Sequence, residues 1–136
     1  MTPTAIYAMK AVLAALVDAG IPATDDPGAF YPDPVRALVG IPALTARGLQ
    51  NASYRVPVTI VSGDPLTDAK KTANLITTAE DAALVLSIAE YRSTSWSGGV
   101  NSEPLPAIEM EAVVSLSILA PDPTEIEEAS NATDGL

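Results

Sequence analysis

IEMEAVVSLSI, residues 108–118, is the stretch of sequence that decides the fold. Apolar side chains occupy every second position, and glutamates or serines occupy most positions between them, which is typical of a strand with one buried and one solvated face. The predicted buried face comprises Ile108, Met110, Ala112, Val114, Leu116 and Ile118. Burial of each large aliphatic side chain contributes roughly 1.5 to 3 kcal/mol, so this strand anchors the predicted core.

Two helices precede this strand in the sequence. Thr2 and Pro3 are suited to starting the first helix, and Gly20 to ending it. Asp64 and Pro65 repeat the start signal for a second helix that runs to about residue 88. Helical spacing predicts the buried positions as Ile6, Met9, Leu13, Leu16 and Val17 in the first helix, and Leu66, Ala69, Ala73, Ile76, Ala83 and Leu86 in the second.

Three further strands are predicted, over residues 36–41, 54–62 and 91–96. The first two form an antiparallel pair with a long connection, and Val56, Val58 and Ile60 form one face of the second. Pro57 has no amide hydrogen to donate, so we expect it at a sheet edge or a bulge, where another chain can pair. The complete pattern predicts an α+β fold, with two helices packed on a mainly antiparallel sheet of about four to five strands.

Composition excludes several functions. The 136 residues include no histidine and no cysteine, which removes disulfides, zinc fingers and histidine-dependent catalysis, and no cofactor is indicated. With 17 acidic and 7 basic residues, the net charge of −10 argues against binding to phosphate backbones. No uncharged stretch is longer than ten residues, the length of residues 37–46, which is too short to span a membrane, so no membrane association is expected.

The chain divides into a domain over residues 1–120 and an acidic tail over residues 121–136. The tail has little to bury and by itself is expected to be disordered. We expect a neighbouring subunit or another partner to order it, with crystal contacts as the alternative. Its candidate contact residues are Glu125, Ile126, Glu127 and Glu128.

Over about residues 4–118, the sequence resembles the tail terminator proteins of long-tailed, siphovirus-type bacteriophages. The resemblance rests on AGIPAT at residues 19–24, the proline-rich loop before residue 36, the Val56-Pro57-Val58 strand leading into Ser62-Gly63-Asp64, and LPAIEM at residues 105–110. The acidic tail is not part of this pattern.

The resemblance implies a structural protein of the virion, assembled in the host cytoplasm and placed at the head-proximal end of the tail. Such subunits form a hexameric ring that caps the tail tube, stops its polymerisation and joins it to the head-tail connector protein. The implied partners are copies of the chain, the tail tube protein and the connector, and DNA passes through the lumen without specific binding. The family implies no catalytic residues, so an enzyme is not expected.

Large apolar residues next to loops are the candidates for subunit contacts, together with Pro57. Phe30 and Tyr31 lie in a loop where such side chains have little reason to be, and capping the local core is the alternative for both. Trp96 lies beside a glycine turn and has the same two alternatives.

Glu109 and Glu111 are the candidates for lining the channel. A ring of subunits that each carry −10 is expected to have a negative lumen, which would repel the phosphates of passing DNA. The loop with Asp25, Asp26 and Asp33 is the alternative source of this charge. Ordinary solvation is the rival role for the glutamates, and catalysis by a carboxylate pair is a weaker one.

Two other functions remain open from the sequence. A head-tail joining or head completion protein of the neck would share the fold and differ in the faces that dock. A small monomeric binding domain or enzyme would need a deep pocket with convergent polar groups.

Overall fold

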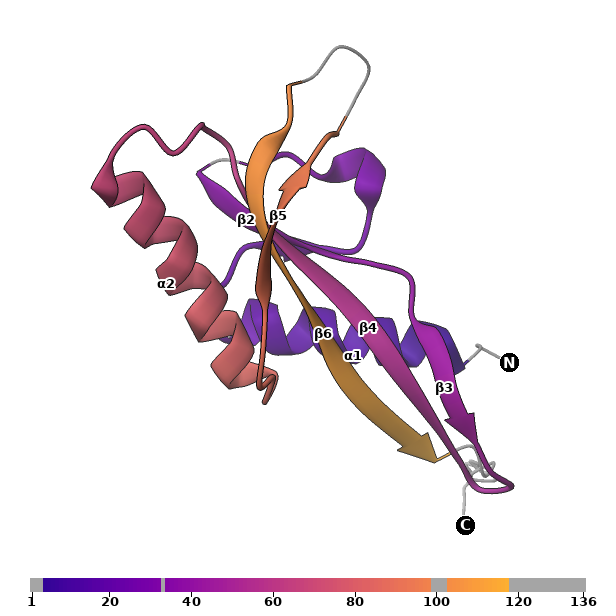
Figure 1. Cartoon of the computed structure of the whole chain (residues 1–136). Coiled ribbons are helices and arrows are strands. Elements are labelled where there is room, and N and C mark those ends of the chain that lie inside the picture. Colours follow the sequence, from indigo (N-terminus) through magenta and orange to yellow (C-terminus); the bar gives the residue numbers. More distant parts are fainter. Residues whose placement is uncertain (1–3, 33, 99–102, 118–136) are drawn as a thin grey trace.

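The computed structural model describes residues 4–32, 34–98 and 103–117. Two helices pack on a mixed sheet of six strands, so the fold is α+β, as predicted (Figure 1). The elements in chain order are α1 (Thr4–Asp18), β1 (Ala23–Thr24), the 3-10 helix η1 (Pro27–Ala29), β2 (Val35–Val39), β3 (Ala43–Arg47), β4 (Asn51–Ser62), α2 (Ala69–Val85), β5 (Arg92–Trp96) and β6 (Leu105–Ser117).

The sheet is built around β4, which lies between β2 and β6 in the order β1-β2-β4-β6-β5. β3 pairs with the first part of β4, on the same side as β2. β1 and β2 are parallel and all other pairs are antiparallel, including the predicted pairing of β2 with β4. The strands that sequence periodicity missed are β1 and β3: β1 has two residues, and every residue of β3 is exposed. Strand prediction depends on apolar and polar residues that alternate along the chain. β1 is too short to show such alternation, and β3 has no buried face that would require it.

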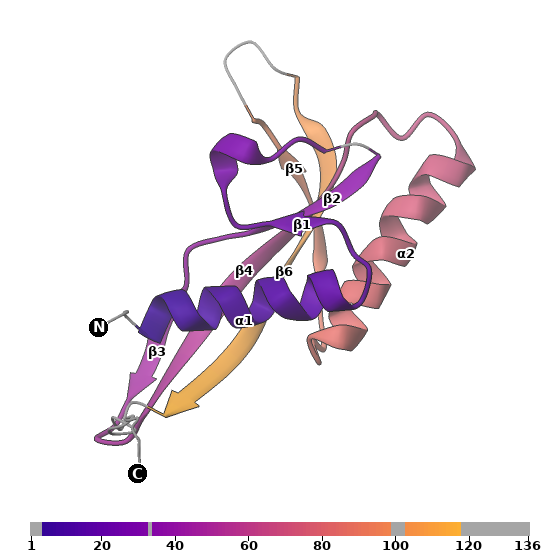
Figure 2. The same ribbon diagram turned by 180° about the vertical axis from the view of Figure 1, so that it is seen from behind.

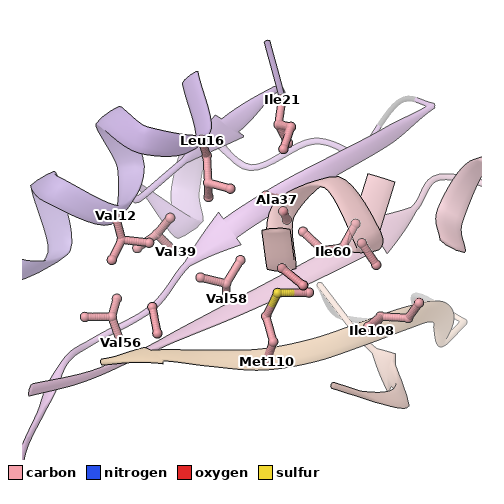
Figure 3. Close-up of a cluster of buried hydrophobic side chains, with 14 of the residues drawn as sticks. Val12, Leu16, Ile21, Ala37, Val39, Val56, Val58, Ile60, Ile108 and Met110 are labelled. Atoms are coloured by element: carbon pink, nitrogen blue, oxygen red, sulfur yellow. The ribbon is translucent and has the colours of Figure 1, made fainter. Parts of the chain in front are cut away.

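The main core lies between the helices and one face of the sheet (Figure 3). Val56, Val58 and Ile60 are fully buried, so the predicted face of this strand is confirmed. On β6, Ile108, Met110 and Ala112 are buried, whereas Val114 and Leu116 are half-buried because the strand extends toward the edge of the helical layer. The predicted core residue Ile118 lies outside the described residues.

Helix α1 buries a stripe that overlaps the predicted one: Leu16 is buried as predicted, and Met9 and Leu13 pack against the core. Its buried residues are Ala8, Val12 and Leu16, whereas Ile6 and Val17 are 40% and 52% exposed. Apolar residues surround much of this helix, so spacing alone missed Ala8 and Val12 and placed Ile6 and Val17 on the buried side. The end of the helix was predicted correctly, since Gly20 has a φ of +83° and the amide of Ile21 donates to the carbonyl of Leu16.

Helix α2 starts later than predicted and also turns another side inward. Its cap is Asp68, whose carboxylate accepts from the amide of Lys71 at 2.8 Å, and Asp64 lies in the preceding turn. The buried residues are Leu75, Ala79, Ala82 and Ala83, whereas Leu66, Ala69, Ala73 and Ile76 are exposed. None of the described helices is both long and apolar enough to cross a membrane.

Candidate functional site

The helices leave one face of the sheet uncovered, which we call the open face. α1 crosses the opposite side of the sheet, as Figures 1 and 2 show from its two sides. Residues that alternate with the core positions lie on the open face, because successive side chains of a strand point to opposite sides. They are Arg36 and Leu38 of β2, Ser53, Arg55, Pro57, Thr59 and Val61 of β4, Arg92, Thr94 and Trp96 of β5, and Leu105, Ala107, Glu109, Glu111, Val113, Ser115 and Ser117 of β6.

A small second core closes one end of the open face. Phe30 reaches over the sheet from the loop after η1 and packs with Val61, Ala107 and Trp96. The rings of Phe30 and Trp96 meet edge to face, with centroids 5.0 Å apart and an interplanar angle of 79°. Among the alternatives left by the sequence, the contacts of Phe30 and Trp96 are therefore those of local core residues. Tyr31 next to them is 72% exposed and stays a candidate for a subunit contact.

The charges on the open face are mixed. Glu109 forms an ion pair with Arg92, from its Oε1 to the arginine Nε at 2.5 Å, so the charge of Glu109 is offset within its own subunit. Arg36 and Arg55 lie on the same face. Glu111 has no ion pair within the described residues. The face is therefore not a uniformly acidic wall, and Glu111 is the better of the two predicted channel residues.

The aspartate loop, the alternative source of lumen charge, is engaged in structural contacts. Asp25 pairs with Lys10 of α1, Oδ2 to Nζ, at 2.6 Å. The Oδ1 of Asp26 accepts from the amide of Gly28 at 2.9 Å and so caps η1. Asp33 lies outside the described residues. The described carboxylates of this loop stabilise the path of the chain from α1 to η1.

Pro57 lies at a break in the sheet, although β4 itself is a central strand. Val39 pairs with Val58 and Ala43 pairs with Arg55, so the three residues 40–42 lie opposite two residues of β4, which is the count of a bulge. The carbonyl of Pro57 accepts from the amide of Gly40 at 2.8 Å, which places the nitrogen of Pro57 on the same side, at this bulge. The irregularity predicted for Pro57 is found here, inside the sheet rather than at its edge.

The outer edge of β6 is free along its second half. β5 pairs with β6 only as far as Glu109, whereas β4 pairs with β6 as far as Ser117. The main chain of Pro57 faces the β2–β3 side, so its partner Glu111 directs its amide and carbonyl away from β4. By alternation the same holds for Val113, Ser115 and Ser117. These groups have no strand partner within the described residues.

A second free edge lies on the other side of the same strands. β3 pairs with β4 alone, and its outer side faces no strand within the described part of the chain. Figure 1 shows β3, β4 and β6 extending together away from β5 and α2. We call this part of the sheet, residues 43–57 with residues 110–117, the three-stranded extension. Among the described residues, its backbone is unpaired on both of its sides, which is the situation that allows other chains to add strands.

A pocket lies where β5 and β6 diverge, next to the free edge of β6. Its volume is about 340 Å³. Pro57, Ile88 and Ala89 supply apolar surface, and Glu90, Glu109 and Glu111 supply carboxylates beside the single cation of Arg92. The pocket is an acidic depression with an apolar component, and it is open to solvent.

One wall of this pocket is held against α2. The phenol of Tyr91 donates to a carboxylate oxygen of Glu80, which fixes the connection between α2 and β5. This hydrogen bond raises the pKa of Tyr91 above its ordinary value, with smaller contributions from desolvation and from the charge of Glu80. Arg92 follows directly and is thereby placed beside Glu109.

The sequence predicted the composition of this surface in part. Pro57, Glu109 and Glu111 were named and lie together around the pocket. The edge of β3 and the exposed Ile41 were missed, because β3 has no alternating pattern, although Ile41 between a glycine and a proline was a readable signal. The predicted tail contacts Glu125, Ile126, Glu127 and Glu128 lie outside the described residues. No protein-family model matches the chain, and the comparison with curated proteins returns no match.

Proposed function

We propose that the protein is a structural subunit of a phage virion, a tail terminator that forms a hexameric ring on the head-proximal end of the tail tube. The observation that carries this proposal is the three-stranded extension with free edges on both sides. The sequence resemblance adds the identity of the assembly. The ring stops polymerisation of the tube and joins it to the head connector, so the partners are copies of this chain, the tail tube protein and the connector protein.

Two different free edges favour a ring over a two-fold dimer. The edge of β6 on one copy meets the edge of β3 on the next, so each copy uses two distinct surfaces. Such a head-to-tail contact forms a closed ring when its rotation closes, and it uses every edge. A two-fold dimer would pair one edge with itself and leave the other free in both copies.

Cyclic symmetry also determines the sense of this pairing. β3 and β6 are both antiparallel to β4, so they run in the same direction within one copy. Rotation about the ring axis keeps the axial direction of every strand, so the β3 of the next copy runs parallel to β6. A parallel pair is the signature of the ring, whereas edge pairing across a two-fold axis between identical strands is antiparallel.

In such a ring the open face of the extension is directed to the lumen and the helices to the outside, because the helical face is already covered. Arg55 and Glu111 then both lie near the channel. DNA passes such a mixed surface without being held, since net attraction for phosphates requires a surplus of cations.

The test is the mass and symmetry of the purified full chain, by light scattering after gel filtration and by electron microscopy. We expect a hexamer with a central channel. Val113→Pro is the matched variant: the amide of Val113 points away from β4, so proline removes a donor from the free edge and spares the β4 pairing. We expect Val113→Pro to be folded and monomeric, and Val113→Thr to assemble. A wild-type chain that stays monomeric, or forms only two-fold dimers, contradicts the proposal.

A further inference from the structure

We propose that the pocket between β5 and β6 receives Ile41 of the neighbouring copy, so that each β2–β3 connection fills the pocket of the next subunit. This inference rests on the ring proposed above. It assigns an occupant to the pocket beside the free edge of β6 and a role to the exposed side chain of Ile41.

In the proposed ring, Ile41 of one copy and the pocket of the next copy lie at nearly the same position along the strand direction. Ala43 and Val113 both pair with Arg55, so they lie at the same height along the strands of one copy. A neighbour related by rotation about an axis along the strands places its Ala43 at the height of Val113. Gly40 contacts Pro57, the partner of Glu111, so Ile41 of the neighbour lies between the heights of Glu111 and Val113, next to the pocket wall that Glu111 forms.

The path of the neighbouring chain leads to the same place. β5 occupies the outer edge of β6 over residues 105–109, where Arg92 pairs with Glu109. A parallel β3 of the neighbouring copy can therefore follow this edge only over residues 110–117. The residues before β3, which are 40–42, must therefore leave β6 where β5 begins. That position is the divergence in which the pocket lies, between residues 88–92 and residues 109–111.

The chemistry of the two parts is complementary. Ile41 is 86% exposed, an unusual state for isoleucine, and the pocket offers it the apolar surface of Pro57, Ile88 and Ala89. Residues 40–46 carry no charge, whereas the pocket has three carboxylates and one arginine. The neighbouring chain therefore adds no negative charge to this acidic pocket, and its apolar side chain fits the apolar part of the lining.

Disulfide trapping tests the contact directly, because the chain has no cysteine of its own. We use two double variants: Ile41→Cys with Ala89→Cys spans the proposed pocket contact, and Ala43→Cys with Val113→Cys spans the proposed edge contact. A disulfide requires Cα atoms within about 7 Å, so each bond reports close approach. On mild oxidation we expect both variants to give ladders of covalent oligomers that end at the closed ring.

The outcomes separate the two proposals. Ladders from the edge pair with none from the Ile41 pair would overturn the pocket contact and leave the ring standing. Covalent dimers alone, or no crosslinks from either pair, would overturn the ring as well.

A substitution gives a second measure. Ile41→Asp places a carboxylate in an acidic pocket, and we expect it to raise the concentration needed for half-assembly at least about tenfold, while Ile41→Leu leaves that concentration unchanged. Ile41 is solvent-exposed in the monomer, so Ile41→Asp should keep the thermal midpoint of the isolated subunit. Assembly of Ile41→Asp at the wild-type concentration would contradict the inference.

Discussion

Sequence and structure both place the side chain of Ile108 on the buried face of β6. It is buried against the helices, and a carboxylate there has no partner, which costs several kcal/mol beyond the lost apolar burial. We expect Ile108→Asp to prevent folding, as measured by circular dichroism and thermal melting. Val113→Asp is the control on the other face of β6, where the side chain is 68% exposed, and it should melt cooperatively near the wild type. Leu116→Asp should fall between them, because Leu116 is only half-buried.

Gly40 and Pro57 form the second residue-level test. A β-carbon on Gly40 would lie 2.8 Å from the Cγ of Pro57, so Gly40→Ala forces the bulge to shift. Overpacking of this kind typically costs about 1 to 3 kcal/mol. In the Pro57→Ala background the close atom is absent, and we expect most of this cost to disappear. Urea unfolding of the four combinations measures the coupling, and equal costs of Gly40→Ala in both backgrounds would show that the two residues do not contact each other.

At the scale of elements, the start of α2 distinguishes the observed cap from the predicted one. Asp68→Ala removes the carboxylate that accepts from the amide of Lys71 and should cost about 0.5 to 2 kcal/mol of unfolding free energy. Asp64→Ala changes an exposed side chain in the turn before the helix and should change stability little. The reverse order of these two costs would place the start of the helix at Asp64, as the Asp-Pro signal alone predicted.

At the scale of the whole molecule, the lumen is tested by charge reversal at Glu111. If Glu111 lines the channel, Glu111→Arg places a ring of cations there and DNA is retained with an affinity that falls as salt rises. The slope of log affinity against log salt should steepen by about 0.9 for each phosphate newly contacted. Asp81→Arg, on the exposed side of α2, makes the same change of charge outside the proposed channel. Equal retention of duplex DNA by both variants would show that Glu111 does not line the channel.

The sequence by itself determined the features that depend on neighbouring residues in the chain. The alternation from Ile108 to Ala112, the buried Val56, Val58 and Ile60, and the end of α1 at Gly20 were all predicted, because a period of two and a left-handed residue are local properties. The presence of both helices was predicted for the same reason.

Only the tertiary structure decided which sides of these elements meet. α1 and α2 carry apolar residues on several sides, so contact with the sheet decided that α1 buries Ala8, Val12 and Leu16 and that α2 buries an alanine-rich stripe. β3, the ion pair of Arg92 with Glu109 and the pocket beside β6 each join residues that are far apart in sequence or lack a periodic signal. The two free edges depend on where β5 and β3 stop pairing. Strand pairing is a property of the whole sheet, so the local pattern of one strand does not indicate which of its two hydrogen-bonding edges stays unpaired.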